Sequence, residues 1–215
     1  MRLLFDLDGT LTDSREGIAR CIRHALAELG VEGQSADAVN SLVGPALHAS
    51  FAALLDTSDV DRLDLAVAIF RQRFEEVGMF ENALYPGIAE AIDEFAASGF
   101  SLYVVTAKPH IYARRILEHF NLARRFLGVY GPELTHRNYS KESLIRQVCA
   151  EEHIGFGEAV MIGDRAEDIL GAKRNGLFSV GALWGYGERS ELEAAQPDCL
   201  AESTDRLIEY IRSAA

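Results

Sequence analysis

Two hydrophobic patterns alternate along most of this chain, one typical of buried strands and the other of amphipathic helices. Short apolar runs, as in strands of a buried sheet, occur at residues 3–5, 101–106, 127–130, 159–162 and 178–183. Apolar positions at helical spacing occur between and after them, at about 88–98, 109–119, 141–152, 166–175 and 204–213. Because such alternation is typical of parallel sheets with helices on both faces, we predict an α/β fold with a doubly wound parallel sheet.

Residues 14–84 interrupt the alternation, and no segment among them is typical of a strand. The pattern predicts a helix from Ser14, a candidate N-cap, to Gly30, and further helical stretches at about 35–42, 46–55 and 60–78. Tyr85-Pro86-Gly87 then marks a boundary. We therefore predict a core domain formed by residues 1–13 and 85–215, with an all-helical domain inserted at 14–84.

Polar side chains of types that serve in catalysis and metal binding follow three of the predicted strands. Asp6 and Asp8 follow the first, in LLFDLDGTLTD; Thr106 ends the second; and Asp164 and Asp168 follow a third, in MIGDRAED. Ligands bind at the carboxyl ends of strands in open parallel sheets. Paired carboxylates suit Mg²⁺, and one can attack an electrophile while another carries a proton. A threonine hydroxyl with neighbouring backbone N–H groups can hold a phosphoryl oxygen.

Lys141 occupies an unusual place, in the first turn of a predicted helix, where the helix dipole favours acidic residues. A phosphate group to neutralise would explain it. Each of these residues also has a plainer interpretation. Lys141 could be a solvated surface residue, Thr106 could cap a turn, Asp168 could complement the helix dipole, and Asp6 with Asp8 could simply end a strand.

Composition excludes several classes of protein. Hydrophobic residues make up 48% of the 215 residues, which supports a folded core. The net charge of −12, without a basic block, argues against a nucleic-acid polymer or an anionic membrane as partner. No apolar run approaches the roughly 18 residues that span a membrane. The three cysteines form no CxxC pair, and the acidic first strand does not resemble a signal peptide, so we expect a cytoplasmic protein.

The motifs together resemble the signature of the haloacid dehalogenase-like (HAD) hydrolase superfamily. LLFDLDGTLTD, TAKPHIYARRIL, GPELTHRNYSKESLI and GDRAED occur in the family order and cover most of the chain. The helical insert resembles the small C1-type cap of phosphoglycolate phosphatase-like and 5′-nucleotidase-like members. This resemblance implies a Rossmann-like HAD core and a phosphatase that acts on a small phosphate ester through an aspartyl-phosphate.

The same resemblance implies a role for each candidate residue. Asp6 would be the nucleophile and Asp8 the general acid and base. Mg²⁺ would be held by Asp6, the backbone carbonyl of Asp8 and Asp164, with Asp168 supporting the metal site. The phosphate-binding residues would be Thr106, Ala107 and Lys141.

Within the insert, LVGPALHASF resembles the substrate-facing loop of such caps, so we expect specificity to involve Gly44, Pro45, Leu47 and His48. The substrate stays open among phosphoglycolate, a nucleoside monophosphate and a sugar phosphate, and the sequence does not indicate an oligomeric state. Two alternatives are a sugar phosphomutase of the same fold and a phospho-accepting regulatory module. A Schiff-base phosphonate hydrolase is disfavoured because residues 14–84 contain no lysine.

Overall fold

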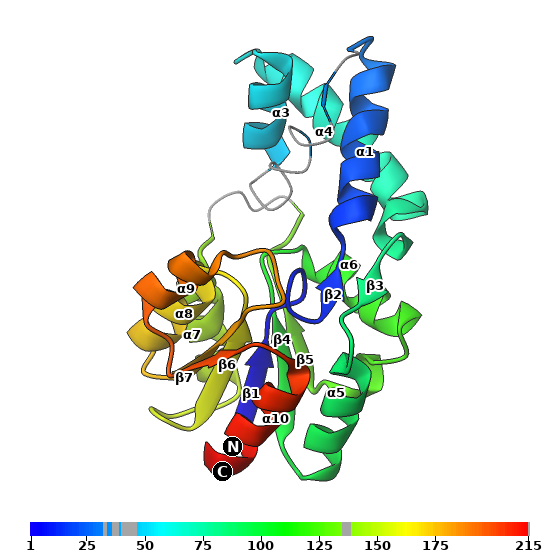
Figure 1. Cartoon of the computed structure of the whole chain (residues 1–215). Coiled ribbons are helices and arrows are strands. Elements are labelled where there is room, and N and C mark those ends of the chain that lie inside the picture. Colours follow the sequence, from blue (N-terminus) through cyan, green and yellow to red (C-terminus); the bar gives the residue numbers. More distant parts are fainter. Residues whose placement is uncertain (32–33, 36–38, 40–46, 135–138, 215) are drawn as a thin grey trace. The chain divides into compact units, whose positions relative to one another are not determined.

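The computed structural model describes residues 1–31, 34–35, 39, 47–134 and 139–214 of the chain. Its main element is a six-stranded sheet in the order β5-β4-β1-β6-β7-β8 (Figure 1). The strands are β1 (Arg2–Phe5), β4 (Ser101–Val105), β5 (Gly128–Tyr130), β6 (Ala159–Gly163), β7 (Phe178–Ala182) and β8 (Cys199–Ala201). Every neighbouring pair is parallel, which confirms the predicted doubly wound sheet.

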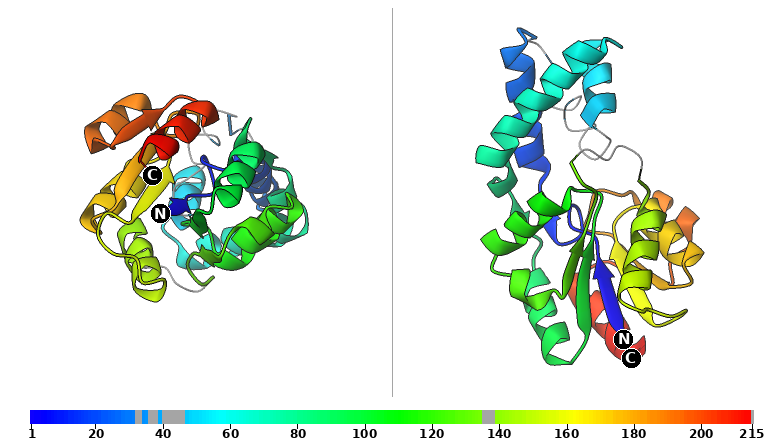
Figure 2. Two further views of the ribbon diagram at one scale, coloured as in Figure 1. Left: turned by 90° about the horizontal axis from the view of Figure 1, so that it is seen from below. Right: turned by 180° about the vertical axis from the view of Figure 1, so that it is seen from behind.

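Helices cover both faces of this sheet (Figure 2). One face carries α7 (Lys141–Glu151), α8 (Ala166–Arg174) and α9 (Arg189–Ala195). The other carries α5 (Ile88–Ala97), α6 (His110–His119), the short 3₁₀ helix η2 (Ala123–Arg125) and α10 (Thr204–Ala214), which packs against α5. Helices on both faces bury the sheet, and β1 and β6 accordingly have almost no exposed side chains.

The alternating side chains of β1 decide which way the first aspartate points. Leu4 packs with Ile145 of α7 in one apolar cluster. Phe5 points to the opposite face, where its ring lies 6.3 Å from that of Phe95 on α5. Since residues two apart in a strand share a face, Asp6 follows Leu4 on the side of α7. Lys141 is the first residue of that helix.

Several short elements were not predicted. The seven-residue helix α9 and the three-residue strand β8 lie where the sequence predicts no regular structure. Two further strands, β2 (Thr12–Asp13) and β3 (Ala83–Leu84), form a separate two-stranded sheet. The expectation that residues 14–84 contain no strand is therefore wrong at its last two positions. Elements this short carry too few residues for a periodic pattern.

The described chain divides into two compact units, Met1–Asp13 with Leu84–Ala215, and Ser14–Ala83. The second unit holds the helices α1 (Arg15–Glu28), α3 (Leu47–Leu55), α4 (Val60–Glu76) and the 3₁₀ helix η1 (Gly78–Phe80). Aromatic rings fill its interior, where Phe70 lies edge-on to Phe51 and stacks on Phe74 at a centroid distance of 5.6 Å. Most of the helix predicted at 35–42 lies outside the described residues.

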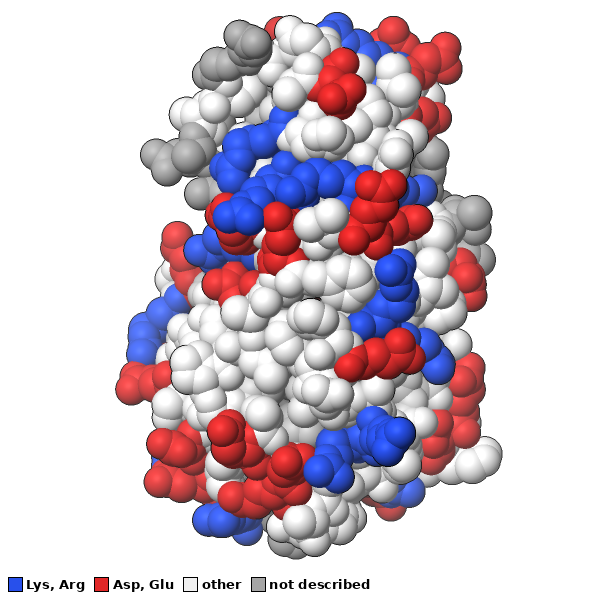
Figure 3. Space-filling view, turned by 90° about the vertical axis from the view of Figure 1, so that its right-hand side faces the viewer, with Lys and Arg blue, Asp and Glu red and all other residues white. Residues whose placement is uncertain are grey.

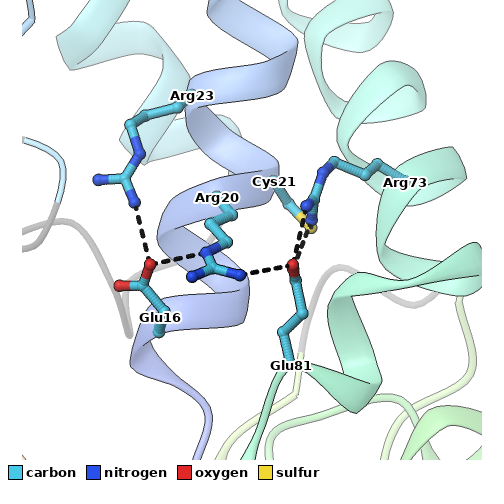
Figure 4. Close-up of polar contacts among 6 residues, drawn as sticks. All are labelled: Glu16, Arg20, Cys21, Arg23, Arg73 and Glu81. Atoms are coloured by element: carbon cyan, nitrogen blue, oxygen red, sulfur yellow. Dashed lines mark hydrogen bonds and ion pairs between the residues drawn. The ribbon is translucent and has the colours of Figure 1, made fainter.

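A polar network ties the helices of the unit Ser14–Ala83 together (Figure 4). The Glu81 carboxylate accepts hydrogen bonds from Arg73 at 2.7 and 3.1 Å and from Arg20 at 2.9 Å. Arg20 also donates to Glu16 at 2.7 Å, and Arg73 donates to the Cys21 thiol at 3.2 Å. Arg20 of α1 and Arg73 of α4 are thus neutralised within their own unit, and their shared partner Glu81 links both helices to the chain after η1.

The surface repeats this mixing of charges. Basic and acidic side chains lie side by side on the face shown in Figure 3. Among the described residues, no helix is both long and apolar enough to cross a lipid bilayer.

Candidate active site

Asp6 follows β1 directly and is 8% exposed. Its Oδ1 atom accepts a hydrogen bond from the Leu7 N–H at 2.8 Å and lies 3.0 Å from the Lys141 ammonium. An N–H donor and a cation on one carboxylate oxygen hold its orientation and stabilise its charge. The carboxylate predicted to be the nucleophile is therefore fixed at the end of the central strand.

Two further carboxylates lie beside Asp6. Asp164 follows β6, the strand that pairs with β1, and Asp168 lies in the first turn of α8. All three side chains are buried, and each offers an oxygen within 4.8 Å of the others. The Asp164 oxygens accept hydrogen bonds from the Thr10 hydroxyl at 3.1 Å and from the Tyr186 N–H at 2.8 Å. The pairing of β1 with β6 thus brings Asp6 close to Asp164, which is 164 − 6 = 158 residues away in the sequence.

Burial and mutual repulsion make this cluster receptive to a cation. Burial, together with the charge of Asp6, raises the pKa of Asp164 to about 6. Burial also raises the pKa of Asp168, although the Lys141 cation opposes it. Buried acids whose charged forms are disfavoured gain most from a positive ion, and carboxylate oxygens are the donors that Mg²⁺ prefers. The donor set therefore fits a hard divalent cation, which could be held by Asp6 and Asp164.

Lys141 lies at the centre of the charges, and its side chain is 7% exposed. Its ammonium is 3.0 Å from Asp6 and 2.7 Å from Asp168, and it donates to the Val105 carbonyl at 3.0 Å. Although burial alone would lower the pKa of Lys141, the carboxylates of Asp168 and Asp6 raise it above its usual range. The buried carboxylates thus compensate for the unfavourable position of this lysine in the first helical turn, and its side chain stays charged.

The turn after β4 contains the third group of predicted residues. Thr106 is 1% exposed, and its hydroxyl oxygen accepts a hydrogen bond from the Lys108 N–H at 3.2 Å. Tyr139 donates its hydroxyl to the Ala107 carbonyl at 2.8 Å. The sheet places this turn next to the end of β1, because β4 is the other neighbour of β1.

Asp8 has a different setting from Asp6. Its carboxylate is not part of the cluster of Asp6, Asp164 and Asp168, and its Oδ2 atom lies 2.9 Å from the Lys108 ammonium. Lys108 was not among the predicted site residues, yet its side chain is 7% exposed. Its position two residues after Thr106, in a chain with only three lysines, was a signal in the sequence. Each aspartate of the DLD motif therefore has its own lysine.

Gly9 allows the loop after Asp8 to approach the acidic cluster. Its φ angle is +84°, a conformation that side chains other than glycine rarely adopt. A Cβ atom at this position would lie 2.2 Å from Oδ2 of Asp164. The turn predicted at Gly9 is thus also a point of close packing.

The four predicted specificity residues are only partly visible. Gly44 and Pro45 lie outside the described residues. Leu47 and His48 begin α3, and Nε2 of His48 lies 2.7 Å from Oδ1 of Asp64 on α4. One ring nitrogen of His48 is thus engaged within its own unit.

Comparison with known proteins shows which family the chain belongs to. Residues 3–182 match the family model of haloacid dehalogenase-like hydrolases. A 5′-nucleotidase of Pseudomonas aeruginosa is 42% identical, over 91% of this chain and 88% of the relative. A phosphoglycolate phosphatase of Vibrio parahaemolyticus is 29% identical, over 99% and 96%. The crystal structure of a predicted phosphatase from Clostridium acetobutylicum has a TM-score of 0.88 at 37% identity, over 99% and 98%. The chain therefore belongs to the haloacid dehalogenase-like hydrolase family.

Proposed function

We propose that this protein is a Mg²⁺-dependent phosphomonoester hydrolase that acts on a small phosphorylated metabolite. One observation carries the proposal. The Asp6 carboxylate is held beside the buried Lys141 ammonium and within 4.8 Å of two more buried aspartates that could hold a metal ion. Two positive charges, the ammonium and the metal ion, can therefore lie next to it. A dianionic phosphate could approach this carboxylate only where positive charge surrounds it. Relatives named for phosphatase activities support the same conclusion.

In the proposed reaction Asp6 and Asp8 act in turn. An Asp6 oxygen attacks phosphorus, the ester P–O bond breaks, and Asp8 gives its proton to the leaving alcohol. Water then attacks the phosphorus of the aspartyl-phosphate, Asp8 takes a proton from it, and inorganic phosphate leaves with Asp6 restored. Mg²⁺, held by Asp6, the Asp8 carbonyl and Asp164, would supply neutralising charge.

Other residues of the core would hold the phosphate. The Thr106 hydroxyl and the Ala107 N–H would donate to its oxygens, and Lys141 would contribute a permanent positive charge. Asp168, whose oxygens lie near the Lys141 ammonium and the Arg165 N–H, would keep that lysine in position rather than bind the substrate.

For the substrate, the names of the relatives favour a nucleoside monophosphate or phosphoglycolate. The unit Ser14–Ala83 would serve as the cap that selects between them, with Gly44, Pro45, Leu47 and His48 as candidate contacts. Cap closure would exclude water during the attack on phosphorus.

Turnover of p-nitrophenyl phosphate tests the proposal. The wild-type protein should release many phosphates per chain with Mg²⁺ and none in excess EDTA, whereas a phospho-accepting regulator would release at most one. Asp6→Asn keeps the side-chain shape and removes the attacking charge, so it should abolish turnover. Asp205→Asn, an exposed aspartate in the first turn of α10, is the matched control and should be as active as wild type. An active Asp6→Asn protein would overturn the proposed mechanism.

A further inference from the structure

The segment Trp184–Gly187, which follows β7, folds back onto the acidic cluster. The Tyr186 N–H donates to Oδ2 of Asp164 at 2.8 Å. The Trp184 indole N–H donates to the Thr10 carbonyl at 3.0 Å, and the Thr10 hydroxyl donates to Oδ1 of Asp164 at 3.1 Å. Both oxygens of Asp164 are thus held, one directly by this segment and the other through a residue that the segment holds.

Glycines make this close approach possible. A Cβ atom on Gly185 would lie 2.3 Å from Cβ of Asp164 and 2.3 Å from the Gly9 carbonyl oxygen. A Cβ atom on Gly187 would lie 1.9 Å from the Asp164 carbonyl oxygen. Neither glycine has a positive φ angle, so these positions need the space of glycine rather than its conformational freedom.

We infer that the segment Trp184–Gly187 is a positioning element that fixes the Asp164 carboxylate for binding a divalent cation. The inference rests on the proposed function, which assigns Asp164 to that cation. A carboxylate with one donor on each oxygen has a fixed plane and fixed remaining lone pairs, so a cation meets ligands that need no reordering. Because Asp164 is buried, no bulk water would restore its orientation if these donors moved.

The chain itself contains a reporter for this contact. Trp184 is the only tryptophan, and its indole is one hydrogen bond from Thr10, which in turn bonds to Asp164. The tryptophan fluorescence of the wild-type protein should therefore change as Mg²⁺ binds. The Mg²⁺ concentration at half of this change should agree with the one at half of the rise in melting temperature.

Two variants test the segment from different sides, by Mg²⁺ titration followed through the melting temperature. Gly185→Ala places a methyl group against Asp164 and should raise the half-saturating Mg²⁺ concentration by roughly 10- to 100-fold, the usual effect of disturbing residues behind a metal ligand. Trp184→Phe keeps an aromatic ring, removes only the indole donor and should raise it several-fold. Gly155→Ala is the control, because its added Cβ would meet only the Glu158 side chain, at 3.3 Å.

The outcomes separate the inference from the proposed function. Weaker Mg²⁺ binding by both variants, with circular dichroism like that of wild type and a normal Gly155→Ala protein, supports the inference. Wild-type affinity in both variants overturns the inference alone. If Gly185→Ala fails to fold, the affinity of Trp184→Phe decides. A wild-type protein that shows no response to Mg²⁺ overturns the proposed cation site, and the inference with it.

Discussion

Lys108 is the residue whose role the structure changes most, because its ammonium lies 2.9 Å from the carboxylate proposed as general acid and base. Lys108→Met keeps most of the side-chain length and removes the charge that orients Asp8. We expect kcat for p-nitrophenyl phosphate to fall by roughly 10²-fold, the lower end of what a general acid–base group contributes.

Lys173→Met is the control for Lys108→Met. Lys173 is the third lysine of the chain and donates to the Ala195 carbonyl, away from the proposed site. Steady-state kinetics and circular dichroism of both variants check the prediction. Equal activities in the two folded variants would show that Lys108 does not support Asp8.

The raised pKa of Asp164, about 6, predicts how pH affects the metal-free protein. A folded-state pKa above the unfolded value means that the folded protein binds this proton more tightly. The Asp164 contribution to the free energy of unfolding is therefore largest at low pH and is lost as pH rises from about 4 to about 6. At higher pH the ionised carboxylate would bind a cation without competition from protons.

Consequently, Mg²⁺ should raise the melting temperature more at about pH 7.5 than at about pH 5. Thermal melts in EDTA and in saturating Mg²⁺ at both pH values measure this difference. Asp164→Asn should remove most of it. The same Mg²⁺ effect at both pH values would contradict the expected competition between proton and metal.

The candidate residues were predictable to the extent that they end strands. Asp6, Thr106 and Asp164 follow β1, β4 and β6, and the carboxyl ends of neighbouring parallel strands must lie together. Lys108 and Tyr186 were not predicted, because their contacts depend on how loops fold back over the sheet. Hydrophobic periodicity contains no information about such loops.

At the scale of elements, hydrophobic periodicity also fails to predict part of the C-terminal region of the core. Its longer helices and β7 have clear apolar patterns, so their existence could be predicted. The strand β8 has only three residues and forms because β7 supplies a partner, with Gly181 paired to Leu200. The helix α9 is held by packing of Leu192 against Ile169 of α8. Tertiary contacts decide such short elements, and local sequence does not.

The network around Glu81 should stabilise the helices of its unit measurably. The Glu81 side chain is 18% exposed and accepts three hydrogen bonds from two arginines. Glu81→Gln removes the charge at nearly constant shape, so we expect it to lower the free energy of unfolding by about 1–2 kcal/mol. The loss of unfolding free energy caused by Glu81→Gln should be smaller at high salt.

Glu16→Gln provides the comparison for Glu81→Gln. Glu16 pairs with Arg20 in the same network, but its side chain is 61% exposed, so its loss should cost only about 0–0.5 kcal/mol. Urea unfolding of both variants measures the difference. A Glu16→Gln effect as large as that of Glu81→Gln would show that burial does not strengthen this network.

At the scale of the whole molecule, the proposed division of labour separates chemistry in the core from selection in the cap. His48→Ala should therefore change the ranking of kcat/KM among phosphate esters and leave p-nitrophenyl phosphate hydrolysis nearly intact. Asp64→Ala removes the 2.7 Å contact of His48 from the other side and tests whether this pair is only structural. If both variants alter all substrates equally, His48 does not select substrates.

The pairing of β2 with β3 has an evolutionary consequence. Residues 14–82 enter and leave the core through these two strands, which lie side by side in one small sheet. Neighbouring strands are only about 4.8 Å apart, so an insertion of any length can begin and end there without stretching the core. Lineages could lengthen, shorten or replace the inserted helices while the aspartates after β1 and β6 stay in place. The catalytic chemistry would then be inherited, and substrate preference could diverge independently of it.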